Sequence, residues 1–271
     1  MSTFARRLLP LLLAGMLLVP LAGTVAAEES GPTADQAMLL QFGSDLVKLT
    51  NSKRSSVGLV ALRADPTLMQ IARDRANVMA ATQTMSHTEP DGTKVWDRIN
   101  AAGMTCYAAG EIIAWNHYPV EYTAAEAIAA WWASPGHRAI MVSTGYNYVG
   151  FGAGMSADGK FYFAGVFAKL PDHTAPWSGF RRAYKQTISA THKRVTVRWK
   201  GNDTRLQVLT AGLRYFEVKW RRVGGDWHSW GTTTATSHRV RWHRGVTYEV
   251  WVRSRDKVGL WGAWHVKRIT P

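Results

Sequence analysis

The chain has 271 residues and a formal net charge of +14, and it contains one cysteine. A single cysteine excludes an internal disulfide framework, so packing must stabilise the cores. The charge is divided unevenly: residues 28–170 carry 11 Lys and Arg against 13 Asp and Glu, whereas residues 171–271 carry 20 against 6. The length and this asymmetry predict two domains with different surfaces and different partners.

The first 27 residues have the pattern of a secretory signal peptide. Arg6 and Arg7 precede an apolar run from residue 8 to residue 22, and small residues at 25–27 supply a cleavage site. The run is shorter than the roughly 20 residues of a spanning helix, and it contains Pro10 and Pro20, which disfavours an uncleaved membrane anchor. We therefore expect a secreted, extracellular protein with no transmembrane segment after cleavage, and we leave open its association with the cell envelope.

Helical spacing of apolar residues predicts the first elements of the mature chain. Residues 34–53 and 66–79 carry apolar side chains at steps of three and four, and residues 96–101 form a short helix that ends at Gly103. Asp65 followed by a proline is expected to cap the second helix. Ser134 followed by Pro135 predicts another helix start, which places His137 in the first turn of that helix.

Polar residues interrupt the elements that follow. Glu111 begins an apolar stretch, 110–114, that is predicted as a short buried strand, where a carboxylate needs a partner or solvent. Thr123 and Glu126 have the spacing of a capping box, which gives Glu126 a structural role. Residues 146–154 and 160–167 are predicted to form a β-hairpin. We expect Cys106 to be a buried small apolar side chain, and we leave an intermolecular disulfide open.

The order of these motifs resembles that of the CAP superfamily, which includes cysteine-rich secretory proteins, antigen-five allergens and plant pathogenesis-related proteins of class one. The resemblance covers about Leu39 to Leu170, and it implies a domain over residues 35–170 with an α-β-α sandwich and a central cleft. The motifs that carry it are Asn51 with Arg54, Ser86-His87, Gly110-Glu111-Ile112-Ile113, Trp132 with Ser134-Pro135-Gly136-His137-Arg138, and Val149-Gly150-Phe151-Gly152.

This resemblance implies that His87, His137 and Glu111 line the cleft. Eukaryotic members have a second Glu shortly after the helix tryptophan, where this chain has Ala133 and Ser134, so Glu126 is the nearest acidic substitute. Two imidazoles and one carboxylate suit a divalent metal such as zinc with water in the open position. The same three residues are also candidates for general acid–base catalysis.

Residues 171–176 form a polar, proline-bearing linker, and alternating apolar residues then predict an all-β domain over 177–271. This part is similar to a bacterial extracellular fibronectin type III domain. The predicted fold class is thus α+β, a CAP-type α-β-α sandwich followed by an all-β fibronectin type III-like sandwich. The matching segments are Val197-Arg198-Trp199, Phe216–Arg221, Gly245–Arg253 and Trp261–Trp264.

Basic and aromatic side chains are expected on the surface of the second domain. Trp251 and Arg253 face outward if their neighbours Val250 and Val252 face inward, and Arg241, Trp242 and Arg244 are placed on a loop. Cations beside aromatic rings suit an anionic envelope polymer or a lipid headgroup. The alternative is a soluble spacer whose tryptophans only pack. Specific nucleic-acid binding is not expected, because we find no base-reading motif.

Three functions remain at this level. The protein binds a ligand or an envelope component through the His/Glu cleft, with the basic sandwich attaching it to the envelope. Alternatively, it is a metal-dependent hydrolase of protein or cell wall, or an adhesion or scaffold protein without catalysis. The oligomeric state is left open. Fold resemblance alone does not choose among these.

Overall fold

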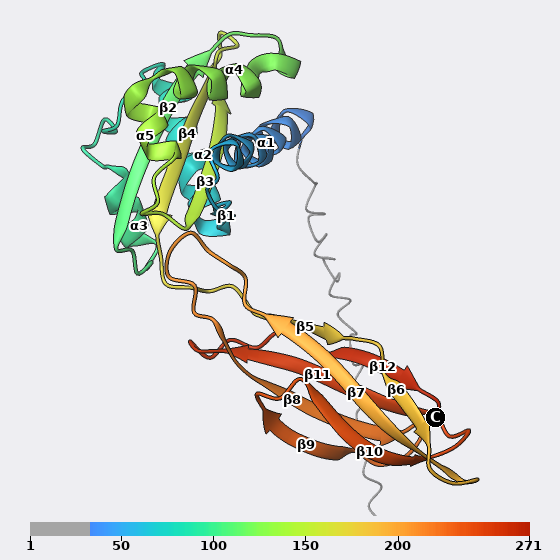
Figure 1. The fold of residues 1–271 in the computed structure, drawn as a ribbon. Coiled ribbons are helices and arrows are strands. Elements are labelled where there is room, and N and C mark those ends of the chain that lie inside the picture. The colour runs from blue at the N-terminus through green and yellow to red at the C-terminus, as the bar shows by residue number, and fades with distance from the viewer. Residues whose placement is uncertain (1–32) are drawn as a thin grey trace, which may run out of the picture.

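A computed structural model describes residues 33–271, which form two domains placed end to end (Figure 1). The predicted signal peptide, residues 1–27, lies outside the described residues. Among residues 33–271 no helix is long and apolar enough to cross a membrane.

The first domain is built on a four-stranded sheet in the order β1-β3-β4-β2, with β1 parallel to β3 and the other pairs antiparallel. The predicted hairpin is present as β3 and β4, and the predicted buried strand as β2. The elements are α1 (Ala34–Ser56), β1 (Arg63–Ala64), α2 (Pro66–Thr82), α3 (Val95–Ala101), β2 (Ala108–Asn116), α4 (Val120–Ala133), α5 (Pro135–Met141), β3 (Tyr148–Met155) and β4 (Phe161–Lys169).

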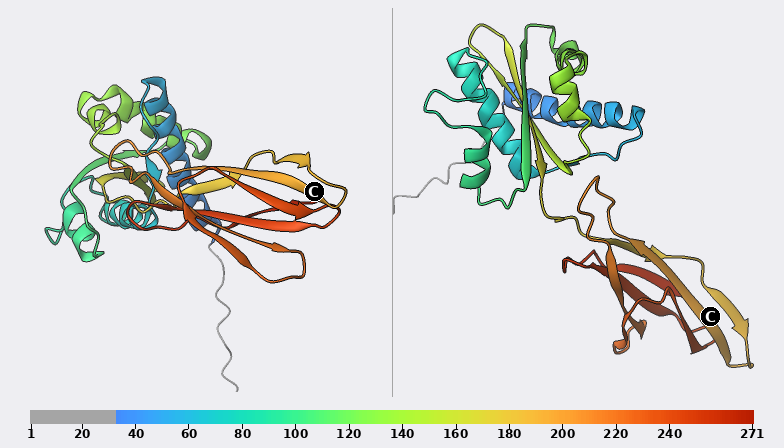
Figure 2. Two further views of the ribbon diagram at one scale, coloured as in Figure 1. Left: turned by 60° about the horizontal axis from the view of Figure 1, so that its bottom comes forward. Right: turned by 60° about the vertical axis from the view of Figure 1, so that its left-hand side comes forward.

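Helices cover both faces of this sheet, so the domain has the predicted three layers (Figures 1 and 2). Successive side chains of β3 point to opposite faces of the sheet, so the apolar core has two parts. Val149 and Phe151 pack against α1 and α4 in one apolar cluster. Tyr148 lies in the other cluster, with α2 and α3. Strands buried on both faces explain why β3 and β4 are almost continuously apolar.

Helix α2 approaches the sheet closely because β3 carries glycines on the face below it. A Cβ atom at Gly150 would lie 2.1 Å from the backbone carbon of Leu68, and one at Gly152 would lie 2.2 Å from the backbone nitrogen of Arg73. Side chains at these positions would force α2 away from the sheet.

The helix starts confirm some of the sequence predictions and correct others. The Asp65 carboxylate caps α2 by accepting the Leu68 N–H at 2.8 Å. Ser134 is the N-cap residue of α5, but its hydroxyl makes no capping bond. The capping box of Thr123 and Glu126 is wrong, because α4 already begins after Pro119. Within α4 the Thr123 hydroxyl instead donates to the Asn116 side chain on β2.

The second domain consists of two four-stranded sheets that share one apolar core. One sheet has the order β10-β7-β5, with β6 also paired to β7, and the other has the order β12-β11-β8-β9. Its elements are β5 (Trp177–Phe180), β6 (Tyr184–Thr187), β7 (His192–Asn202), β8 (Leu213–Arg222), β9 (His228–Thr233), β10 (Ser237–His243), β11 (Tyr248–Asp256) and β12 (His265–Ile269). The finer likeness to fibronectin type III stays a prediction.

Trp242 corrects the expected surface of this domain. The segment assigned to a loop is strand β10, so its residues alternate between two faces. Trp242 therefore points inward, is 2% exposed and stacks on Tyr248 with ring centroids 4.3 Å apart. Arg241, the preceding residue, is exposed.

A loop of the second domain, residues 203–212 between β7 and β8, docks on the first domain. Leu206 is 3% exposed and belongs to the apolar cluster under α2. The Gln207 side-chain oxygen accepts the Val60 N–H at 2.9 Å, and Asn147 donates its side-chain amide to the Val208 carbonyl at 3.1 Å. The two domains are therefore joined by this docking loop as well as by the segment 171–176.

Candidate functional site

Glu111 is the residue from which the cleft is built. Strand β2 places its carboxylate in the interior, with the side chain 4% exposed. The Arg75 guanidinium, on α2, donates from Nε to Oε1 at 2.7 Å and from Nη2 to Oε2 at 3.2 Å. His87 Nδ1 lies 2.7 Å from Oε2. Both carboxylate oxygens are thus occupied, which satisfies the charge that the sequence placed in a buried strand.

Arg75 also pairs with a second carboxylate, Glu89, on the side away from the cleft. Arg75, whose side chain is fully buried, also donates to Glu89 at 3.0 Å and to the Ser86 carbonyl at 2.8 Å. Glu89 in turn binds Arg98 at 2.5 Å and 2.7 Å, and these bonds, chiefly those from Arg98, lower the pKa of Glu89. The network fixes the Ser86-His87 segment relative to the sheet.

The two histidines lie on different elements and face the same region. The His87 side chain is 59% exposed. His137, in the first turn of α5, is half-buried. Burial lowers the pKa of His137, and the nearby charge of His87 lowers it further. The structure therefore pairs His87 with Glu111, and the charge of His87 influences His137, which forms no hydrogen bond or ion pair with either residue within residues 33–271.

A family model matches the first domain. Residues 47–167 match the model described as the cysteine-rich secretory protein family, CAP. The match supports a CAP domain, and we call the first domain by that name. The chain is 28% identical over 131 residues to the uncharacterized protein YkwD of Bacillus subtilis, a match that covers 48% of this chain and 49% of that protein. The chain thus spans about half the length of this curated relative.

Two solved structures align with the CAP domain. An extracellular protein containing a SCP domain from Bacillus anthracis is 25% identical, and the match covers 52% of this chain and 45% of that chain with a TM-score of 0.44. An outer surface protein from Borrelia burgdorferi is 24% identical, and that match covers 47% of this chain and 91% of that chain with a TM-score of 0.42.

Glu126 is not joined to the other cleft residues. It is half-buried on α4, and its side chain forms none of the ion pairs or side-chain hydrogen bonds found among residues 33–271. Within the same residues, no three His, Cys, Asp or Glu side chains are grouped to hold a metal ion. Both oxygens of Glu111 bind Arg75 and His87, so this carboxylate is not free to act as the third ligand of the predicted zinc site with water in its open position.

The hydrogen bonds of the cleft define which ring nitrogen of His87 carries a proton. Because the Glu111 carboxylate only accepts hydrogen bonds, Nδ1 of His87 carries a proton, and in the neutral ring Nε2 is an acceptor. This nitrogen is presented on an exposed side chain whose orientation the buried network fixes. It can bind a donor on a ligand or accept a proton from one.

Within residues 33–271, neither Ser86 nor Cys106 has the hydrogen-bond partners of an activated nucleophile. Ser86 Oγ accepts the Thr88 N–H in a turn. The thiol of Cys106 is half-buried and donates to the Ala108 carbonyl at 3.2 Å, and burial raises its pKa. A raised pKa keeps this thiol protonated at neutral pH, which is the unreactive form.

Sequence reasoning did not identify Arg75 and Glu89 as cleft residues. A signal for Arg75 was present, because it interrupts the apolar stripe of α2 between Ile71 and Met79. A charged residue on a buried helical face requires a partner, and Glu111 was the other unexplained buried charge. No comparable pattern marked Glu89.

The predicted surface residues of the second domain have different environments. Trp251 and Arg253 lie on the outer face of β11 but are half-buried, because Lys219 and Arg253 pack among the tryptophans there. Lys219 Nζ lies 5.3 Å from the Trp251 ring centroid, and Arg253 lies 4.5 Å from that of Trp264. Arg253 also pairs with Glu217 at 2.6 Å. Arg253 thus has a carboxylate partner and Lys219 lies over tryptophan rings, whereas Arg241 and Arg244 are exposed.

Proposed function

We propose that this chain is an extracellular binding protein whose second domain attaches it to an anionic polymer of the cell envelope. Its CAP domain presents the cleft of His87 and His137 to a ligand. The observation that carries the proposal is the charge of the second domain. Residues 171–271 carry 20 Lys and Arg against 6 Asp and Glu.

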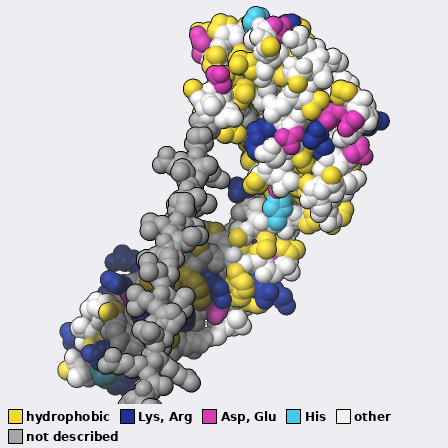
Figure 3. Space-filling view, turned by 180° about the vertical axis from the view of Figure 1, so that it is seen from behind, with side chains coloured by type: hydrophobic (Ala, Val, Ile, Leu, Met, Phe, Trp, Pro, Cys, Tyr) yellow, Lys and Arg dark blue, Asp and Glu magenta, His cyan; other side chains and the backbone are white. Residues whose placement is uncertain are grey.

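The excess of positive charge is larger at the surface of the second domain, because most of its acidic side chains are buried. Four of the six acidic side chains are buried, Glu217 is half-buried and paired with Arg253, and Asp226 alone is exposed. In the view of Figure 3, Lys and Arg side chains gather on the second domain, whereas the first domain displays acidic and basic groups together. A surface of one sign attracts polyanions and concentrates them locally.

The cleft supports binding better than catalysis. Its carboxylate is held by Arg75, its exposed imidazole is oriented, and the neighbouring Ser86 hydroxyl is engaged in a local hydrogen bond. These features supply polar recognition without a nucleophile. Secretion rests on the pattern of the first 27 residues.

The attachment proposal is tested by sedimentation of the chain lacking residues 1–27 with purified bacterial cell walls. One portion of wall keeps its phosphate-rich polymer, and another has been stripped of it by hydrogen fluoride. Vesicles of phosphatidylcholine and phosphatidylglycerol form a third arm. We expect binding to the intact wall that is lost on stripping. Equal binding to both walls, or binding to vesicles alone, would overturn the proposal.

Whether the cleft binds zinc is a separate question, and calorimetry of the same chain beside His87→Ala and His137→Ala answers it. Because Glu111 is held by Arg75, we expect no tight zinc site. Tight binding that both substitutions remove would contradict this expectation and favour the metal-dependent hydrolase.

A further inference from the structure

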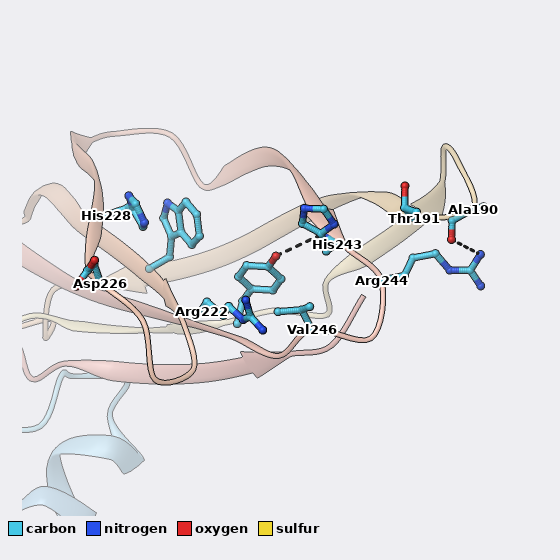
Figure 4. Close-up of a pocket in the computed structure, with 10 residues that line it drawn as sticks. Ala190, Thr191, Arg222, Asp226, His228, His243, Arg244 and Val246 are labelled. Carbon is cyan, nitrogen blue, oxygen red and sulfur yellow. Dashed lines mark hydrogen bonds between the residues drawn. The ribbon is translucent and has the colours of Figure 1, made fainter.

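A hollow lies at the end of the second domain that is remote from the docking loop. It has a volume of about 630 Å³ and is bordered by the ends of β8, β10 and β11 (Figure 4). Trp220 and Tyr248 supply aromatic rings to its wall. Arg222, His228, His243 and Arg244 are the basic residues around it. Neither the CAP cleft nor the outer face of β11 includes these residues.

The aromatic part of the wall is held rigidly. Trp220 stacks on His228 with ring centroids 4.5 Å apart and packs against Tyr248 at 5.9 Å. The Tyr248 hydroxyl accepts the backbone N–H of His243 at 3.3 Å. Trp242, behind Tyr248, stacks on it within the core. The rings are therefore positioned before any ligand arrives, which reduces the entropic cost of binding.

The cations around the hollow are not neutralised by the protein. The ion pairs of the second domain, within the part that the structure describes, use Arg221, Arg253 and Arg268. Arg222 takes part in none of them, and the Arg244 guanidinium donates only to the Ala190 carbonyl, at 3.4 Å. Asp226 is the one carboxylate on the rim. The hollow thus has two available guanidinium groups at its border and aromatic side chains in its wall.

We propose that this hollow binds an acidic sugar unit, a pyranose ring that bears a carboxylate or a phosphate, within an envelope glycan. The Arg222 guanidinium binds the anionic group of this unit, since arginine matches carboxylate and phosphate geometry. The Arg244 guanidinium, which points away from Arg222 toward Ala190, binds the anionic group of a neighbouring unit of the glycan (Figure 4). The stacked side chains of Trp220 and His228 line the wall that the sugar ring contacts. The inference rests on the proposed function, and it specifies the polymer as a glycan and the contact as this hollow.

The arrangement favours a glycan over a lipid surface. The exposed apolar side chains beside the hollow stand on two separate turns, with Ile188 on one and Val223 and Trp227 on the other. Among the described residues they do not form one continuous apolar face beside the cations. Membrane-binding surfaces combine basic residues with a continuous apolar face that enters the headgroup layer. A hollow with aromatic walls instead fits a single ring.

The test is calorimetric titration of the chain lacking residues 1–27 with a galacturonic acid tetrasaccharide, with a neutral galactose tetrasaccharide and with inorganic phosphate. The double variant Arg222→Ala/Arg244→Ala removes the two guanidinium groups. Arg182→Ala/Arg214→Ala removes two exposed arginines of the same domain outside the hollow and is the matched control. Asp226→Asn removes the rim carboxylate.

We expect the acidic tetrasaccharide to bind and the neutral one not to. Loss of two charge-assisted contacts should weaken binding roughly tenfold or more in the first double variant, with the control changed less than about twofold. Asp226→Asn should bind more tightly. Equal weakening in both double variants would overturn the site, because it would indicate diffuse attraction. If inorganic phosphate bound as tightly as the acidic tetrasaccharide, the proposal would also be overturned, because the hollow would then be a site for free anions.

Failure of the site and failure of the proposed function give different results. If the acidic tetrasaccharide does not bind while the chain still sediments with intact wall, the site is wrong and attachment stands. If the tetrasaccharide binds in the hollow but the chain does not sediment with wall, attachment is wrong and the sugar site stands.

Discussion

At the scale of residues, Arg75 is the side chain on which the cleft depends. It is fully buried and compensates two buried carboxylates, Glu111 and Glu89. Replacement by methionine leaves both carboxylates without this partner, so Arg75→Met should destabilise the protein by about 3–5 kcal/mol. Arg73→Met, on the half-exposed side of the same helix, should change stability by less than about 0.5 kcal/mol. Urea denaturation compares the two; similar losses would contradict the assigned role.

The two cleft histidines provide a second prediction at this scale. Burial is the larger cause that lowers the pKa of His137 from its ordinary value of 6.5, and the charge of His87 is the smaller one. In His87→Ala the pKa of His137 should therefore rise but stay below 6.5. An NMR titration of the His137 ring measures this change. A pKa that does not move would show that the two imidazoles do not share one cleft.

At the scale of elements, the contact between α2 and β3 makes a sharp prediction. Gly150→Ala places a methyl group against the backbone of Leu68, where no flexible side chain can move aside. We expect a loss of about 1–3 kcal/mol or more in urea denaturation. Gly136→Ala on α5 is the control, because no atom lies within 4 Å of the added Cβ. That variant should be neutral or stabilised by up to roughly 1 kcal/mol; equal losses in both would refute the close approach.

Most elements of the first domain could be predicted from local pattern, because the helices show apolar spacing and α2 has a proline after its cap. The start of α4 could not be predicted in this way. The Thr123 side chain contacts Asn116, which belongs to another element and is not part of the local pattern. Trp242 was misplaced because its strand was interpreted as a loop. His87, Glu111 and His137 followed from the family resemblance, whereas Arg75 and Glu89 required tertiary contacts between α2 and distant segments.

At the scale of the whole molecule, the docking loop joins the stability of the CAP domain to the second domain. Leu206 fills a site in the first domain's core, whereas Leu209 in the same loop is 40% exposed. Leu206→Asn should lower the thermal midpoint of the CAP domain, with a loss of about 2–4 kcal/mol. Leu209→Asn should leave it unchanged, because asparagine also tolerates the positive φ of 61° there. Scanning calorimetry checks both; no shift with Leu206→Asn would show independent domains.

This coupling affects how attachment is studied. Removing the second domain also removes Leu206 and the Gln207 side chain that accepts the Val60 N–H, which leaves part of the CAP core exposed. If such a truncation lost binding, the loss could come from unfolding of the CAP domain or from removal of the positive charge. Substitutions of exposed arginines in the full chain separate the two effects.

Salt dependence of binding to polymer-bearing cell walls tests the central claim most directly. The claim is that the unneutralised positive charge of residues 171–271 holds the protein at the envelope. Exposed charges are screened over roughly 10 Å at 0.1 M salt and roughly 3 Å at 1 M. The account predicts that the affinity of the chain lacking residues 1–27 falls steeply across this range. An affinity that is unchanged by salt would contradict it.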